Sequence, residues 1–335
     1  MGQKVHLPNF LRSPRCEVVA LADVRSRMAA AVARRHGIPR SYGSHRDIAA
    51  DPEVEAVAAI MNEGLHRQVA VDLLEAGKHV YLEKPIARSV AEAEDMVRAA
   101  EANGRILMIG YMKRYDTGVR RARELLARLP EELGPITLVR AHCFGGNWIC
   151  GLDTDTHPTD EPAAPPPPTV PDWLPPERRR SFLDFNNVYC HNLNLVRFLV
   201  GEPEEIEYVG LGRGAHHIVL RYPGFLATFE LGSLSSDRWD EDTVIYFAHG
   251  VLRLVTPPPL LVNMPARIEL YRATGAHERV EISGSWGWAF RNAAEHFLEC
   301  VQTGAAPDST ARDSLADMAL VEGIYQRVVS GAVKA

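Results

Sequence analysis

Short apolar runs alternate with helix-like segments from Glu17 to about residue 110, and this alternation constrains the fold more than any other feature of the chain. The runs are apolar throughout, as expected for strands whose two faces are both covered. Strands that alternate with helical segments are typical of βαβ units around a parallel sheet. The four runs are residues 18–22, 56–60, 79–82 and 106–109.

The pattern changes after Pro135, where short runs separated by turn residues predict a mostly antiparallel sheet. Two helices close the chain, at about residues 286–302 and 309–329. The sequence therefore predicts an α/β fold: a Rossmann-type parallel sheet in residues 1–115, followed by an α+β domain with an open sheet in residues 116–335. We expect the closing helices to be able to pack back on the first domain. The runs after Pro135 are residues 137–144, 206–211, 217–222, 226–231, 243–248, 251–255, 268–271 and 279–282.

A proline-rich loop occupies residues 151–180 and includes a run of four prolines at 165–168. Proline at this density builds neither a helix nor a central strand, so an extended surface segment is predicted. Two interpretations stay open. The loop is either a tolerated insertion or a lid or dimer-contacting arm near a substrate pocket.

The tripeptide Glu83-Lys84-Pro85 follows one of the predicted buried strands directly. The carboxyl ends of strands in an open α/β sheet face the ligand crevice, so Lys84 can reach a substrate oxygen beside a bound nucleotide. Pro85 restricts the backbone of Lys84 and holds it at a defined angle. The alternative is a charged strand-to-helix turn without chemistry.

Together with its surroundings, this tripeptide resembles the glucose-fructose oxidoreductase and inositol dehydrogenase (Gfo/Idh/MocA) family, and the resemblance covers nearly the whole chain. It implies a nicotinamide-dependent oxidoreductase with a dinucleotide-binding domain, residues 1–115, and a substrate and oligomerisation domain, residues 116–335. The implied substrates are sugars, sugar nucleotides or cyclitols. The matching segments are residues 51–57, 64–66, 76–80, 83–87, 110–116, 191–195 and 201–203, with Asp313 in the last helix.

Of the two parts of the expected cofactor site, the sequence lacks most of the glycine-rich turn for the phosphates but has the acidic residue for the ribose. Gly2 falls where the last glycine of a GxGxxG turn would lie, so the first strand and two glycines are absent. We expect the natural start to lie upstream; the alternative is a degenerate protein that does not bind a dinucleotide in the usual way. Asp23, at the end of the strand at 18–22, predicts contact with the adenosine ribose and a preference for NAD, with NADP possible because Arg25 and Arg27 are near. A helix N-cap is the alternative role for Asp23.

The catalytic candidates are Lys84 and His191, since oxidation of a hydroxyl needs a base and the reverse reaction an acid. The resemblance implies that a histidine of the second domain, four residues after an aspartate, joins the lysine. Here the histidine is His191, but Asn187 stands at the aspartate position. Asn194 also replaces a common family aspartate. The loss of negative charge should lower the pKa of a neighbouring cation.

Further residues are expected around this site. Candidates for cofactor binding are Gly2, Asp23, His66, Glu83 and Lys84; His66 should lie near the nicotinamide, although Met61-Asn62 replaces the family's Thr-Pro. Lys113 or, preferably, Arg114 is expected to bind substrate. Other histidines are interpreted as structural or exposed. The remaining substrate-binding candidates are Asn187, Tyr111, Tyr189, Asn194 and Asn186.

Composition and charge exclude several classes of binding partner. The net charge of −6 argues against nucleic-acid binding. The five cysteines form no CxxC pair, which fits reduced thiols in the cytoplasm. A zinc site is not expected, because the spacing of its possible ligands matches no common zinc site; these are His142, Cys143, Cys150 and His157. No run is long enough to span a membrane, and no signal peptide is visible. We therefore expect a cytoplasmic homodimer or homotetramer without metal that acts on a small polyol or sugar. A noncatalytic relative that senses or scaffolds is the alternative.

Overall fold

The computed structural model describes residues 1–164 and 169–331, and the run 165–168 lies outside them. The chain divides into two compact units. Unit 1 combines Met1–Tyr111, Asp153–Trp173 and Ala293–Ala319, and unit 2 combines Met112–Leu152, Leu174–Asn292 and Leu320–Ala335. The first switch between units lies close to the predicted boundary at residue 115, but the chain also returns to unit 1 twice.

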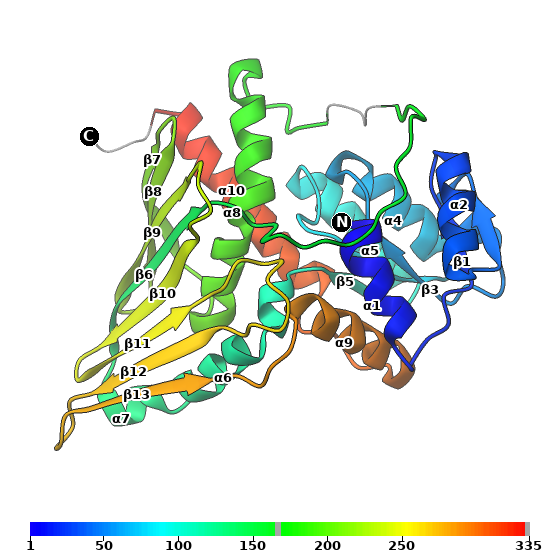
Figure 1. Ribbon diagram of the computed structural model, residues 1–335. Helices are drawn as coiled ribbons and strands as arrows, with labels where there is room; N and C mark the ends of the chain where they lie inside the picture. The colour runs from blue at the N-terminus through cyan, green and yellow to red at the C-terminus, as the bar shows by residue number, and fades with distance from the viewer. Residues whose placement is uncertain (165–168, 332–335) are drawn as a thin grey trace. The chain divides into compact units, whose positions relative to one another are not determined.

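Unit 1 shows the predicted alternation of strands and helices (Figure 1). Its central strand β4 is buried on both faces, and Val80, Tyr81 and Leu82 have no exposed surface. In order, the elements are η1 Gly2–His6, α1 Leu7–Arg12, β1 Ala20–Ala22, α2 Ser26–His36, β2 Arg40–Tyr42, α3 His45–Ala50, β3 Ala56–Ala59, η2 Glu63–Leu65, α4 His66–Glu75, β4 His79–Leu82, α5 Val90–Ala102 and β5 Leu107–Ile109.

The strands of unit 1 form two parallel sheets, one of β1 and β2 and one of β3, β4 and β5. In the Rossmann strand order 3-2-1-4-5-6 these sheets match the 3-2 flank and the 4-5-6 flank. Within residues 1–164 and 169–331 no strand lies between β1 and β3, so each of these two strands pairs on one side only. The predicted Rossmann-type fold class is confirmed.

Unit 2 is built on one eight-stranded sheet in the order β13-β12-β11-β10-β6-β9-β8-β7. All neighbours are antiparallel except β6 and β9, which confirms the predicted mostly antiparallel sheet. The elements are η3 Met112–Tyr115, α6 Thr117–Leu126, α7 Leu129–Leu133, β6 Ile136–Gly145, η4 Pro176–Arg178, α8 Arg179–Val200, β7 Glu205–Leu211, β8 Ala215–Tyr222, β9 Phe225–Ser233, β10 Asp240–Phe247, β11 Gly250–Val255, β12 Arg267–Arg272 and β13 Glu278–Ser283. The closing helices are α9 Ala289–Thr303 and α10 Ala311–Val329.

The two faces of this sheet differ. In the described part of the chain, helices of unit 2, among them α6 and α8, lie along one face of the sheet, and the other face carries none (Figure 1). The helix-free face carries charged side chains, since Glu230 accepts hydrogen bonds from Arg140 and lies 3.0 Å from His142 Nδ1. Consecutive strand residues point to opposite faces, so Cys143 is turned away from His142 and the two cannot share one zinc ion. No helix of the described chain is long and apolar enough to cross a membrane.

Candidate functional site

The Glu83-Lys84-Pro85 turn lies at the carboxyl end of β4, as predicted. Glu83 is 7% exposed, and its Oε1 lies 2.7 Å from His6 Nε2. Its Oε2 accepts a hydrogen bond of 3.0 Å from the Lys84 backbone N–H. Burial acts to raise the pKa of Glu83, but the bond to His6 and the charges of His6 and Lys84 outweigh it, so the pKa is lowered. Glu83 therefore anchors the turn to the first helix.

His66 fixes the same turn from its other end. It is the first residue of α4 and 99% covered, and its Nδ1 lies 2.9 Å from the carbonyl oxygen of Pro85. Burial lowers the pKa of His66, so the ring is neutral and Nδ1–H donates to Pro85. The residue thus holds the turn around Lys84, whose bond to Pro85 is cis. Lys84 itself is half-buried.

Asn62, one of the departures from the family pattern, has a defined role beside this turn. Its side-chain oxygen caps η2 by accepting from Gly64 N at 3.0 Å, and it also accepts from Arg88 Nη2 at 2.8 Å. Arg88 is paired with Glu63 as well, at 3.1 Å. The loop after β3 is therefore tied to the segment after Pro85 without the usual Thr-Pro.

The adenosine end of the expected cofactor site lies after β1. Asp23 follows β1 directly, and its carboxylate accepts from the Nε and Nη2 atoms of Arg25, both at 2.8 Å. It does not cap α2, which begins after Arg25 with no side-chain cap. A Cβ added at Gly2 would meet no atom within 4 Å, so the space beside this residue is open. An acidic side chain at the end of this strand fits the adenosine ribose of a dinucleotide.

Helix α8 carries the predicted residues of unit 2. Asn187 is exposed and His191 half-buried, and their spacing of four residues places them on one face of the helix. Tyr189 instead packs in an aromatic cluster, with its ring 5.3 Å from those of Phe185 and His216. Burial raises the pKa of Tyr189 to about 12. Tyr189 therefore packs within unit 2. Asn186 and Tyr111 are buried, with 2% and 1% exposure, so they offer little surface to a substrate.

Arg114 and Asn194 are buried and hydrogen-bonded to each other. Arg114 is 3% exposed, donates from Nε to Asn194 Oδ1 at 2.7 Å and lies over the ring of Phe198. The preference for Arg114 over Lys113 as a substrate ligand stays a prediction, and the contacts of Arg114 give it a packing role. A charged residue directly after a strand resembles a ligand in the sequence, but the residues that bury Arg114, Asn194 and Phe198, come from the distant helix α8.

Glu241 is the centre of a polar cluster that the sequence analysis missed. This buried carboxylate pairs with Lys113, accepts from Asn192 Nδ2 at 2.8 Å and from Trp239 Nε1 at 3.2 Å. No alternation of apolar and polar residues marks Glu241, because residues 241–245 of β10 are all buried.

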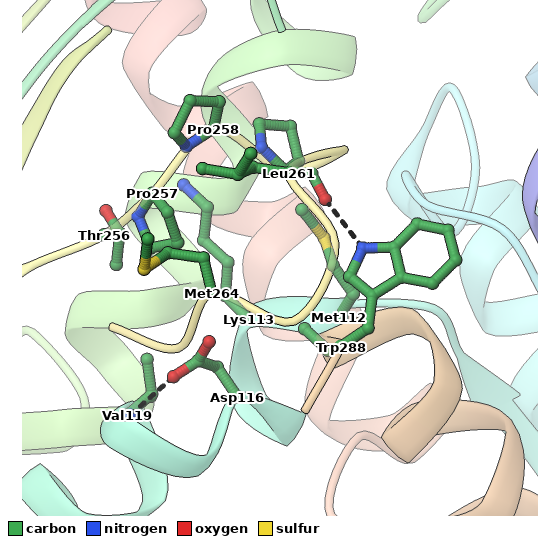
Figure 2. A pocket seen from close by; sticks show the side chains of 12 residues that line it. Met112, Lys113, Asp116, Val119, Thr256, Pro257, Pro258, Leu261, Met264 and Trp288 are labelled. Atoms are coloured by element: carbon green, nitrogen blue, oxygen red, sulfur yellow. Dashed lines mark hydrogen bonds between the residues drawn. The ribbon is translucent and has the colours of Figure 1, made fainter. Parts of the chain in front are cut away.

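Figure 2 shows a cavity in unit 2 that Lys113 lines together with Met112, Asp116 and Trp288. Its volume of about 30 Å³ has room for about one water molecule and none for a sugar. Asp116 caps α6 through Gly118 N at 2.8 Å and also accepts from Ala266 N at 3.0 Å. The cavity is therefore part of the packing between α6 and the loop before β12. No group of three metal-ligating side chains occurs in the part of the chain that is described.

Comparison with known proteins agrees with this picture. The model of the oxidoreductase family with an NAD-binding Rossmann fold matches residues 1–111. Trans-1,2-dihydrobenzene-1,2-diol dehydrogenase from Oryctolagus cuniculus is 29% identical over 87% of the chain and 84% of its own length. D-xylose 1-dehydrogenase (NADP(+)) 2 from Haloferax volcanii is 26% identical over 94% and 91%. The crystal structure of aldose-aldose oxidoreductase from Caulobacter crescentus, complexed with glycerol, has a TM-score of 0.74 at 23% identity and covers 97% and 93%.

Proposed function

Since the chain belongs to the Gfo/Idh/MocA family of NAD(P)-dependent oxidoreductases, we propose that it transfers a hydride between NAD and a hydroxyl-bearing carbon of a sugar, sugar nucleotide or cyclitol. The single observation that carries this proposal is the Lys84 turn, held at the end of β4 by Glu83 on one side and His66 on the other. The names of the relatives, which include a diol and a D-xylose dehydrogenase, support a polyol as substrate.

Lys84 is the proposed proton carrier. When bound, the nicotinamide supplies the hydride acceptor or donor. The chain must then move one proton to or from the substrate oxygen, and a side chain held at a fixed angle does this without reorganisation. The Glu83 carboxylate binds the Lys84 N–H and the His66 ring binds the Pro85 carbonyl, so the backbone is fixed on both sides. His191 is the second candidate for proton transfer, with Asn187 beside it to hydrogen-bond a hydroxyl.

We expect NADH to bind more tightly than NADPH, by about tenfold or 1.4 kcal/mol. Asp23 carries the negative charge after β1, and Arg25 is already bound to it. A 2′-phosphate would therefore meet a carboxylate and not an available guanidinium. Isothermal titration calorimetry with both cofactors measures the difference.

The same titration tests the function. Binding of NADH, followed by reduction of NAD⁺ with at least one of D-xylose, D-glucose and myo-inositol, is the expected result. Equal or tighter binding of NADPH would contradict the assignment of Asp23 as a ligand of the adenosine ribose. Absence of binding for either cofactor would contradict the proposed function itself.

A homodimer or homotetramer that forms through the helix-free face of the unit 2 sheet is also proposed, in the cytoplasm. This face combines ion pairs with half-exposed rings such as Tyr208 and Tyr271, each 37% exposed, and such a mixed surface suits an interface between copies. All five cysteines are free thiols, as a reducing compartment requires. Light scattering at micromolar concentration should give at least twice the monomer mass of 37.1 kDa. A monomer would contradict the proposal.

A further inference from the structure

Residues 153–161, here named the acidic arm, lead into the proline-rich run and belong to unit 1. Several contacts hold them there. Thr154 Oγ1 donates to the Lys4 carbonyl at 3.3 Å, and Asp155 pairs with Arg35. The side chain of Gln3 accepts from His157 N at 2.7 Å and donates to His157 O at 3.3 Å. The acidic arm therefore runs along the first helical turn and across to α2.

At its end the acidic arm places two carboxylates on the first turn of α2. Glu161 accepts from the backbone N–H of Arg27 at 3.0 Å and of Met28 at 2.9 Å. Its side chain is 13% exposed and lies 3.4 Å from Arg27 Nε. Asp160 pairs with Arg27 Nη2 at 2.9 Å. Burial acts to raise the pKa of Glu161, but the two backbone donors and Arg27 outweigh it and lower the pKa, so Glu161 is ionised at neutral pH.

This turn between β1 and α2 is the part of a Rossmann fold that distinguishes NAD from NADP. An arginine here usually receives the 2′-phosphate. In this chain both arginines of the turn already have acidic partners, because Arg25 is bound by Asp23 and Arg27 by Asp160 and Glu161. The 2′-hydroxyl of NAD is uncharged and can lie beside this arrangement. A phosphate would have to displace the acidic arm or accept its repulsion.

We propose that Asp160 and Glu161 are specificity-determining residues that exclude NADP by occupying Arg27 and the first backbone donors of α2. This proposal rests on the proposed NAD-dependent function and adds a determinant that lies far along the chain from the strand end carrying Asp23. It also gives the proline-rich loop a role, since the loop carries the acidic arm.

The test compares NADH and NADPH binding in wild type, Glu161→Gln and the double variant Asp160→Asn/Glu161→Gln by calorimetry. Glutamine keeps an acceptor for the α2 backbone but removes the charge. For Glu161→Gln we expect the ratio of the NADPH to the NADH dissociation constant to fall about fivefold, the order expected when one unit charge is removed near a phosphate in water. The double variant should lower it further, and added salt should reduce the difference from wild type.

Asp155→Asn is the matched control, because Asp155 lies on the same acidic arm but pairs with Arg35 in the last turn of α2. It should leave the ratio unchanged. An unchanged ratio in both the single and the double variant, or equal weakening of both cofactors, would overturn the assignment of Asp160 and Glu161 while leaving the proposed function intact. Wild-type protein that binds neither cofactor would overturn both.

Discussion

Replacing Lys84 with alanine is expected to lower turnover by about a hundredfold or more, the usual effect of losing a well-placed acid or base. The dissociation constant for NADH should stay close to that of wild type, because the lysine is proposed to meet the reacting oxygen and not the adenosine. Steady-state kinetics and calorimetry on the same preparation measure the two effects separately.

Lys84→Arg separates proton transfer from charge. Arginine keeps the positive charge but does not release its proton at neutral pH, so this variant should bind substrate and still turn over slowly. If the alanine variant, shown to be folded, keeps near wild-type turnover, Glu83-Lys84-Pro85 is only a turn in this chain.

Replacing His6 with alanine is expected to cost roughly 3 to 5 kcal/mol of folding stability, because it removes the only side chain that pairs with the buried Glu83 carboxylate among the described contacts. Chemical denaturation should show a clear fall in the transition midpoint. The double variant His6→Ala/Glu83→Gln should be more stable than His6→Ala alone, since no buried charge is then left unpaired. His36→Ala, at an exposed position of α2, is the control and should change stability by about 0.5 kcal/mol or less.

The pH dependence of this effect has a defined sign. The pKa of Glu83 is lowered in the folded protein, so its contribution to stability is present above the pKa of the unfolded chain, about 4.3. It is lost as the pH falls through the folded value. The stability difference between wild type and His6→Ala should therefore shrink in acid. A difference that is small at neutral pH would mean that His6 is not the partner that keeps Glu83 ionised.

The fold class could be predicted from the sequence because its signals are local. Apolar runs of strand length predicted β3, β4 and β5, and the change of pattern after Pro135 predicted the second sheet. The family motifs predicted an NAD(P)-dependent oxidoreductase, which the comparisons confirm.

The side-chain partners could not be predicted, because they join residues far apart in the chain. His6 and Glu83 are 77 residues apart, and Arg27 and Glu161 are 134 apart. No local pattern marks either pair. The partner of Arg114 could not be predicted for the same reason. Its position after a strand suggested a substrate ligand, whereas the fold buries its side chain against Asn194.

Transfer of the hydride itself can be followed with an isotope label. The protein would be incubated with NAD⁺ and with D-xylose, D-glucose or myo-inositol that carries deuterium on its hydroxyl-bearing carbons, and the nicotinamide product analysed by mass spectrometry. We expect deuterium to appear in the reduced nicotinamide with at least one of these polyols, and Lys84→Ala to suppress the transfer. NADH that binds tightly while no polyol transfers deuterium would contradict the proposed hydride transfer and favour a ligand-binding role.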